Sequence, residues 1–344
     1  MTRLALLFVL SGLLACGGDG PGAGLGRKPS DAPAGLHLLV TTMGGFSAET
    51  VLTGAIELDL DLEPTWRAAV DAPAGALGAV RLADGDTLVM ATEAPPGTYA
   101  EVLRVGPDSA VVDRIATADG QSFAFPHGIG QTADGVIVVG DSFRGRVVGL
   151  DGDTGAQVWS LAVDLFSEGS ISGAYLGPRE DDGSHRLGLT LVGNIADDST
   201  QHTVRMYRIP AGGGEPVAEW AWPSRPDIAD CLWPHGVTFD ADGTVLVGLG
   251  GLGQIVRLDA AGAAVRHFPP DDAPRRLNFP RHVAVLPDGR WVVSDGGTEL
   301  LVVADPEGAF AVEDARALQG VYDVHVLDCA AVPCHGSADA PVGF

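Results

Sequence analysis

Aromatic residues make up only 6% of the sequence, and 21 basic residues stand against 45 acidic ones, for a net charge of −24. A surface this acidic repels nucleic acid and anionic lipid head groups, so we expect no nucleic-acid partner; solubility is the simplest reason for the charge. No stretch keeps a helical periodicity, and no apolar run beyond the N-terminus could span a membrane. Gly and Pro are abundant instead, with 48 and 23 copies among 344 residues, which suits short strands joined by tight turns.

Cysteine is also scarce, with four copies. Cys329 and Cys334 lie close enough in the sequence to form a small disulfide loop in an oxidising compartment. Metal binding by this pair is the weaker interpretation, because no second Cys pair accompanies it. Cys231 is left over as a single thiol, either buried or weakly reactive.

The fourth cysteine follows an export signal. Arg3 supplies a positive charge, Leu4–Leu14 forms a short apolar core, and small residues come next. The letters LLAC end at Cys16 and resemble a bacterial lipobox, which implies cleavage before Cys16 and a lipid anchor, including palmitate, at that residue. Gly17 in place of Asp favours the outer membrane of the cell envelope, with membrane contact through the anchor only. The alternative is an ordinary signal peptide cut near Ala15, which would leave Cys16 free.

Three segments repeat one pattern, over residues 125–151, 233–259 and 279–305. Each has Pro as its second residue, runs through an apolar strand, turns at Asp-Gly and continues as two more strands, which predicts a three-strand antiparallel meander. A unit this short cannot bury both faces of its sheet, so the copies must pack against one another. Asp-Gly turns recur roughly every 50 residues, a period typical of repeat architectures, at Asp84-Gly85, Asp134-Gly135, Asp182-Gly183, Asp242-Gly243 and Asp288-Gly289.

The two ends of the chain supply one further unit. Val321–Leu327 matches the first strand of a blade and Leu36–Leu62 matches the remaining strands, so together they would close a ring and remove exposed sheet edges. We therefore predict an all-β, monomeric six-bladed β-propeller over residues 36–344. A signal peptide at 1–15 and a flexible tether at 16–35 would precede it.

Acidic and apolar residues alternate within the strand expected at Thr53–Leu62 and just beyond it. The acidic row comprises Glu57, Asp59, Asp61 and Glu63. Because residues two apart on a strand share one face, this row is interpreted as a solvated outer face rather than as a metal-binding face.

The repeated phrase Pro-His-Gly-Ile/Val, followed by Asp-Gly and by a strand ending in Asp, resembles NHL-repeat and related six-bladed propellers. The resemblance covers three blades closely and two loosely, and it implies the fold without fixing a function. Related propellers include scaffolds, SMP-30-type lactonases, streptogramin-type lyases and the peptidyl-α-hydroxyglycine amidating lyase. Asp151–Trp159 also resembles a quinoprotein-type blade turn, which keeps an arylsulfotransferase- or quinoprotein-like enzyme among the alternatives.

Histidines occur at the start of the strands that would line the central channel. His127 and His235 hold equivalent positions two blades apart, and a further two-blade step ends near His325. Three imidazoles on the axis could bind zinc and leave a fourth position open. The resemblance to the amidating lyase implies zinc held in this manner and calcium on the backbone carbonyls of Ile129 and Val237, although His325 lacks the preceding Pro. The alternative is that these histidines only hydrogen-bond a neighbouring blade.

Two residues of the last full repeat are further channel candidates. Arg281 falls at the histidine position and would suit an anionic substrate, whereas His282 comes one residue later and should point differently. Asn194 and Asp197 could ligate calcium, as the resemblance to lactonase-type propellers implies. The catalytic residues stay unassigned, because no Ser-His-Asp order, phosphate loop or dinucleotide fingerprint occurs. We expect a propeller that binds a ligand or a protein partner, with a metal-dependent lyase or hydrolase as the alternative.

Overall fold

A computed structural model describes the chain over residues 35–43, 54–69, 75–92, 100–165, 169–193, 202–223, 233–269, 277–306, 311–318 and 320–335. Within these ranges, no helix has the length and apolar character needed to cross a membrane. The expected signal peptide, Cys16 and nearly all of its tether, Cys231, Asn194 and Asp197 lie outside the described residues.

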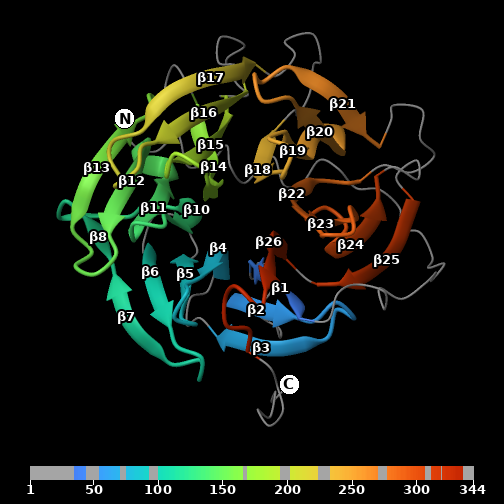
Figure 1. The fold of residues 1–344 in the computed structure, drawn as a ribbon, viewed down its shortest axis with the longest axis horizontal. Helices are drawn as coiled ribbons and strands as arrows, with labels where there is room; N and C mark the ends of the chain where they lie inside the picture. Colours follow the sequence, from blue (N-terminus) through green and yellow to red (C-terminus); the bar gives the residue numbers. More distant parts are fainter. Residues whose placement is uncertain are drawn as a thin grey trace, which may run out of the picture.

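Six four-stranded antiparallel sheets stand around one central axis, as the blades of a propeller (Figure 1). The predicted all-β, six-bladed β-propeller is therefore confirmed. Counted along the chain and from the axis outward, blade one is β4 (Gly75–Arg81), β5 (Thr87–Thr92), β6 (Ala100–Val105) and β7 (Val111–Ile115); blade two is β10 (Pro126–Gln131), β11 (Val136–Asp141), β12 (Arg146–Asp151) and β13 (Gln157–Ala162); blade three is β14 (Ser170–Arg179), β15 (His185–Val192), β16 (Thr203–Ile209) and β17 (Val217–Pro223).

The remaining blades follow the same order. Blade four is β18 (Pro234–Phe239), β19 (Val245–Leu249), β20 (Gln254–Leu258) and β21 (Ala264–Phe268); blade five is β22 (Pro280–Val285), β23 (Trp291–Asp295), β24 (Leu300–Asp305) and β25 (Ala311–Ala317); blade six is β26 (Val321–Asp328), β1 (Leu36–Thr42), β2 (Gly54–Leu58) and β3 (Pro64–Ala69). A small ribbon of β8 (Thr117–Ala118) and β9 (Gln121–Ser122) and the 3-10 turns η3 (Ser142–Arg144) and η4 (Gly250–Leu252) complete the described elements.

Each predicted three-strand meander continues into a fourth, outermost strand. In β7 and β21 most side chains are exposed, and neither strand carries a Pro-His-Gly opening or an Asp-Gly turn. The repeat pattern therefore identified the three strands that pack between neighbouring blades, and it missed the strand that faces solvent.

Blade six joins the two ends of the chain, as predicted. β26 and β1 run antiparallel from the pair Leu36–Asp328 to the pair Thr42–Val321. The single strand expected over Thr53–Leu62 is corrected: β2 ends at Leu58, and a turn leads into β3. Leu62 has a φ of +61° in that turn, which no strand residue adopts.

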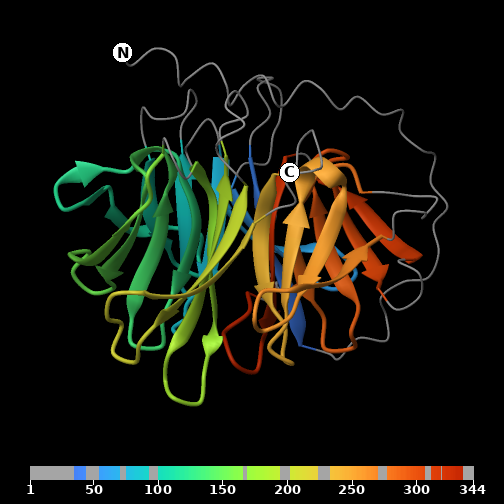
Figure 2. The same ribbon diagram turned by 90° about the horizontal axis from the view of Figure 1, so that it is seen from above.

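All five Asp-Gly turns join the innermost strand of a blade to the next strand, and their glycines have φ between +82° and +95°. Glycine adopts this left-handed backbone at little cost. The turns lie on one face of the propeller, the lower face in Figure 2, where the long hairpin of β14 and β15 projects farthest.

The blades pack face to face through six hydrophobic clusters, one at each interface between neighbours. Indole N–H groups of the outermost strands form hydrogen bonds across three of these interfaces. Each donates to a backbone carbonyl in an outer turn of the next blade: Trp66 to Pro107 at 2.9 Å, Trp159 to Gly213 at 3.0 Å and Trp220 to Ala260 at 3.0 Å. The turn that resembles quinoproteins, Asp151–Trp159, thus ends in an inter-blade tie far from the axis.

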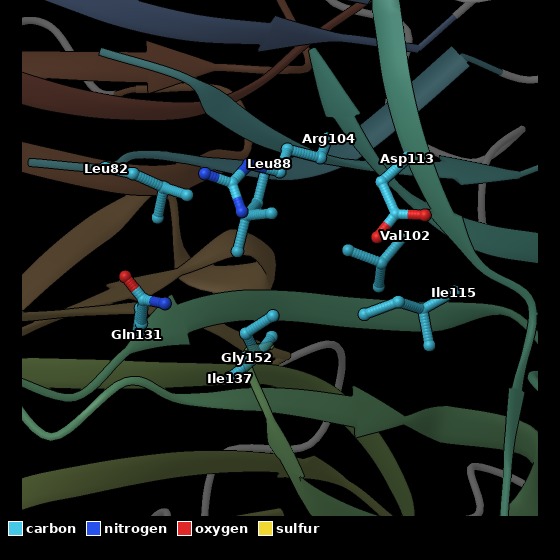
Figure 3. Close-up of a pocket in the computed structure, with 9 residues that line it drawn as sticks. All are labelled: Leu82, Leu88, Val102, Arg104, Asp113, Ile115, Gln131, Ile137 and Gly152. Atoms are coloured by element: carbon cyan, nitrogen blue, oxygen red, sulfur yellow. The ribbon is translucent and has the colours of Figure 1, made fainter. Parts of the chain in front are cut away.

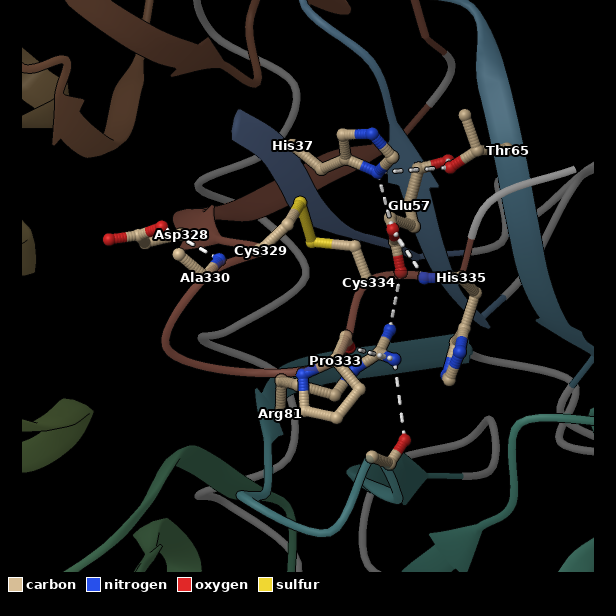
Figure 4. Close-up of a disulfide and its surroundings, with 11 residues drawn as sticks. His37, Glu57, Thr65, Arg81, Asp328, Cys329, Ala330, Pro333, Cys334 and His335 are labelled. Carbon is tan, nitrogen blue, oxygen red and sulfur yellow. Dashed lines mark hydrogen bonds and ion pairs between the residues drawn. A yellow bond between two sulfur atoms is a disulfide. The ribbon is translucent and has the colours of Figure 1, made fainter. Parts of the chain in front are cut away.

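The prediction that the row of acidic residues is solvated is wrong for Glu57. Its side chain is fully buried where blade six meets blade one (Figure 4). Its carboxylate lies 2.6 Å from the Arg81 guanidinium and 2.5 Å from His37 Nδ1. The backbone N–H of His335 donates to the same carboxylate at 2.9 Å. Glu57 therefore links the first and last segments of the propeller to blade one.

A disulfide joins Cys329 and Cys334, the pair expected to form a small loop. The loop follows β26 and lies against the buried ion pair in Figure 4, with Arg81 Nη1 donating to the carbonyl of Pro333 at 3.2 Å. Together, the disulfide loop and Glu57 fasten the closing blade on the face that carries the Asp-Gly turns.

Candidate functional site at the propeller axis

The innermost strands share one irregularity that sets which residues reach the axis. In all six blades the register between the innermost strand and its neighbour slips near the strand start. In each blade, one residue of the innermost strand comes directly after the last residue that is paired before the slip. We call these six residues the axial ring: Leu77, His127, Ser172, His235, Arg281 and Tyr322. Arg281 thus holds the histidine position of its blade, as the repeat pattern indicated.

Tyr322, and not His325, occupies the ring position of blade six. Its hydroxyl lies 3.0 Å from His127 Nδ1 in blade two, although blade one stands between the two. Its ring also lies 4.4 Å from the Arg281 guanidinium and 6.4 Å, centroid to centroid, from His235. The tyrosine therefore extends across the axis and lies close to residues of three other blades, namely blades two, four and five.

His127 is buried, and its Nδ1 lies 3.2 Å from the carbonyl oxygen of Ser172. Because a carbonyl can only accept, we assign the ring proton to Nδ1. Nε2 is then a buried lone pair without a partner. Burial lowers the pKa of His127 to about 4, so its imidazole is neutral at pH 7. His127 thus offers one free acceptor at the axis.

Unpartnered polar atoms surround the ring of Phe279, just before β22. Trp233 and His235 lie 5.6 Å and 5.0 Å from Phe279 between ring centroids, and the Arg281 guanidinium carbon lies 5.5 Å from it. Trp233 Nε1, both His235 nitrogens and Arg281 Nε are buried atoms with no hydrogen-bond partner. Buried polar atoms in native proteins are nearly always bonded to protein or to ordered water, so water or a polar ligand would complete the hydrogen bonding of this group.

Arg281 forms no ion pair with any carboxylate of the described residues. Its guanidinium lies on the faces of Tyr322 and Phe279 and makes a weak contact of Nη1 with the Met43 sulfur at 3.9 Å, and the Asp295 charge attracts it without an ion-pair contact. Burial lowers the pKa of Arg281, and burial together with the Arg281 charge lowers the pKa of His235 well below its usual value. Arg281 is therefore the fixed positive charge beside neutral imidazoles.

Burial raises the pKa of Tyr322 to about 12, and the nearby Arg281 charge opposes this shift. The hydroxyl of Tyr322 is therefore protonated at neutral pH. It contacts Nδ1 of His127, not the free Nε2, and supplies a polar but uncharged group at the centre of the axial ring.

The described residues include no close group of the three histidines that the sequence suggested for zinc. His325 lies three residues beyond Tyr322 and pairs with Leu39, at the level where blade two has Gly130. His127 and His235 do not form a metal-sized group with it, that is, a group whose ligand atoms lie close enough together to bind one ion. His325 instead joins His282 and Asp323, whose ligand atoms lie with its own within 4.8 Å of one another.

Asp323 bridges the two histidines of this second group. One carboxylate oxygen contacts His282 Nδ1, and the other lies 2.9 Å from His325 Nε2. Although burial would raise it, the charges of His282 and His325 hold the pKa of Asp323 far below its usual value. Burial alone would lower the pKa of His325, yet the Asp323 charge raises it. His282, a further channel candidate from the sequence, is a buried member of this group, and Asp323 is its centre.

The two backbone positions implied for calcium lie beyond the axial ring, on β10 and β18. Ile129 and Val237 follow the register slip, and their side chains are buried in the inter-blade core. The carbonyl of Val237 lies 3.3 Å from His282 Nε2 and accepts its hydrogen bond. That carbonyl therefore supports a histidine in this structure.

One hollow away from the axis is too small to hold a ligand. It lies between blades one and two, and its volume of about 10 Å³ has room for roughly one water molecule (Figure 3). Arg104, Asp113 and Gln131 contribute polar side chains to its wall. The axial groups remain the candidate site.

Comparisons with known proteins identify the fold. No family model matches the chain, and no curated protein matches it. A chain of the nidogen/laminin complex is similar over 85% of this chain and 98% of its own length, with a TM-score of 0.56 and 16% identity. A protein of unknown function from Bacteroides caccae has a TM-score of 0.56 and 14% identity over 86% and 99% of the two chains. Virginiamycin B lyase from Staphylococcus aureus has a TM-score of 0.52 and 14% identity over 83% and 89%. At these identities the likeness establishes the propeller architecture alone.

Proposed function

We propose that the propeller binds a small organic anion at the axial ring, where Arg281 meets the charge and Phe279 and Tyr322 contact the body of the ligand. The observation that carries this proposal is a buried arginine, in a chain of net charge −24, whose Nε has no hydrogen-bond partner and which forms no salt bridge with a carboxylate of the described residues; Asp295 acts on it only from a distance. A desolvated charge that has no counter-ion is costly, and a bound anion would offset that cost.

The neighbouring atoms narrow the class of ligand. Trp233 Nε1 and Arg281 Nε can only donate, which suits carboxylate or phosphate oxygens, whereas His127 Nε2 can only accept. An anion that also carries a hydroxyl or N–H group satisfies both kinds of atom. Since aromatic rings lie between them, we expect an aromatic hydroxy acid such as mandelate to bind more tightly than benzoate, which lacks the hydroxyl.

The first test is calorimetric titration of the mature full-length protein with mandelate, benzoate and inorganic phosphate. Replacing Arg281 by methionine keeps the length of the side chain and removes its charge. We expect affinity for the bound anion to fall about 10- to 100-fold, because a buried charge-assisted hydrogen bond contributes about 1.5–3 kcal/mol.

The matched control is Arg290→Met. Arg290 belongs to the same blade and lies in the Asp-Gly turn, at the other end of the innermost strand from Arg281. Arg290 is paired with Asp288, so its loss changes the net charge equally but should leave affinity unchanged. Anions that fail to bind the unmodified protein, or equal affinities for Arg281→Met and the unmodified protein, would overturn the proposal. Thermal unfolding of each variant verifies that it is folded.

We further propose that the protein is exported and held at the membrane by a lipid on Cys16. The LLAC sequence before Gly17 supports this, as does the disulfide at Cys329, because disulfides persist in oxidising compartments. Cys16→Ser should abolish incorporation of labelled palmitate and move the protein from the membrane fraction to the soluble fraction. Cys231→Ser is the control that should change neither. Labelling that survives Cys16→Ser would contradict the anchor.

The alternative function is a lyase or hydrolase of the propeller class to which the amidating lyase belongs. The observation in its favour is the neutral His127, with a free Nε2, beside the protonated hydroxyl of Tyr322. Such a pair can accept and donate a proton next to a bound anion. Turnover of any compound in the binding panel, followed by chromatography, would favour the enzyme over the binding protein.

A further inference from the structure

We propose that His282, Asp323 and His325 form a binding site for a divalent metal ion of the zinc class, held between blade five and blade six. The site is separate from the anion site, because its ligands come from positions beyond the axial ring on β22 and β26. It also differs from the three-histidine set that the repeat spacing suggested.

The ligand atoms already lie at nearly the required separations. His325 Nε2 lies 2.9 Å from Asp323 Oδ2, His282 Nδ1 contacts Oδ1, and all three ligand atoms lie within 4.8 Å of one another. In a tetrahedral zinc site with bonds of about 2.0 Å, neighbouring ligand atoms lie roughly 3.3 Å apart. Small side-chain movements would therefore open the space for an ion.

Groups behind the ligands hold them in place. The far nitrogen of His282 lies 3.3 Å from the carbonyl oxygen of Val237, which is the usual arrangement for a metal-binding imidazole. The ring of Tyr175 stacks on His282 with centroids 4.8 Å apart. Asp323 Oδ1 accepts the N–H of Val324 at 3.0 Å. The two ligands His282 and Asp323 are thus fixed by packing and by hydrogen bonds.

The set of donors indicates the class of metal. Two imidazoles and one carboxylate suit zinc and neighbouring divalent transition metals, whereas calcium and magnesium prefer oxygen ligands alone. Asp323 is almost fully buried, with a side-chain exposure of 2%, while 32% of the His325 side chain is exposed. Three protein ligands leave at least one coordination position for water or an exogenous ligand.

The other metal-sized group among the described residues does not compete when the protein is oxidised. It consists of His37, Cys329 and Cys334. The two sulfur atoms are joined as a disulfide and are not thiolates, which are the metal-binding form of cysteine. Metal titrations must therefore be performed without reductant.

The test uses the mature full-length protein, stripped of metal with a chelator and titrated with Zn²⁺ by calorimetry. We expect one ion per chain. Asp323→Asn and His325→Asn should each lower the affinity at least about 100-fold, since even the loss of a group behind a ligand costs about 10- to 100-fold. The second variant alters a partly exposed side chain, so it still tests the site if Asp323→Asn fails to fold.

The discriminating control is the double variant His127→Gln/His235→Gln, which should retain one zinc per chain with unchanged affinity. Co²⁺ should give an absorption spectrum without an intense thiolate band, because the site has only nitrogen and oxygen ligands. Absence of stoichiometric zinc, unchanged affinity in both ligand variants, loss of the ion in the double variant, or a thiolate band would each overturn the proposal. None of these outcomes depends on whether mandelate or phosphate binds at Arg281.

Discussion

Replacing Glu57 by alanine should lower the free energy of unfolding by about 3–5 kcal/mol, the usual effect of removing one partner from a buried ion pair. The side chains of Glu57 and Arg81 are 0% and 1% exposed. The variant would therefore leave a guanidinium in the protein interior without its counter-charge. Urea unfolding followed by tryptophan fluorescence measures the change, and Trp66, which lies 5.0 Å from Arg81, reports on this junction.

Glu101→Ala is the matched control for Glu57→Ala. Glu101 is also a buried strand glutamate in an ion pair, with 4% of its side chain exposed, but its partner Arg114 is 53% exposed. Water can solvate that arginine once the glutamate is gone, so we expect a loss below about 1 kcal/mol. Equal losses in the two variants would show that the guanidinium of Arg81 also reaches water.

The second large effect is expected from Gly128→Ala, which should cost about 3 kcal/mol or more. Gly128 has a φ of +83°, and a Cβ atom at this position would lie 2.2 Å from the carbonyl oxygen and 2.4 Å from the nitrogen of Ala174. Those atoms belong to the backbone of the next blade, which cannot rotate away as a side chain can. The cost adds backbone strain to an overpacked contact between innermost strands.

Gly135→Ala separates these two contributions. Gly135 has nearly the same φ, +88°, but nothing lies within 4 Å of the Cβ position. Only the conformational cost remains, about 1–2 kcal/mol. Thermal or urea unfolding gives the free energy of unfolding of both variants, and the difference between the two values is the cost of the close contact. If the two variants are equally stable, the innermost strands of blades two and three are not in the close contact described.

The fold could be predicted from sequence because its signals are local. Asp242-Gly243 and its four counterparts set hairpins within a few residues, and the apolar strands beside them have period two. Glu57 shows where such reasoning fails. Its partner Arg81 belongs to the next blade, and the N–H that it accepts belongs to His335 at the other end of the chain. An alternating acidic row looks solvated until the packing of distant segments is known.

The candidate site could be predicted only where a motif marked the register. Pro-His-Gly placed His127 and His235, and the same alignment placed Arg281. In β26 no such motif exists, so the two-blade spacing points to His325, although Tyr322 holds the ring position. Of the aromatic rings beside Arg281, Phe279 lies two residues away in the same segment, whereas Tyr322 comes from blade six and no local pattern encodes that contact.

Closure of blade six also determines at which stage of folding the proposed anion and metal sites are complete. The N–H of Asp323 donates to Thr41 Oγ1 across a separation of 282 residues, a loop whose closure costs about 5 kcal/mol of chain entropy. Tyr322, Asp323 and His325 all lie on β26. During synthesis, five sheets can form before this strand arrives, and a nascent chain at that stage has neither the complete axial ring nor the complete set of proposed metal ligands. Anion or zinc binding would therefore distinguish finished molecules from unfinished ones.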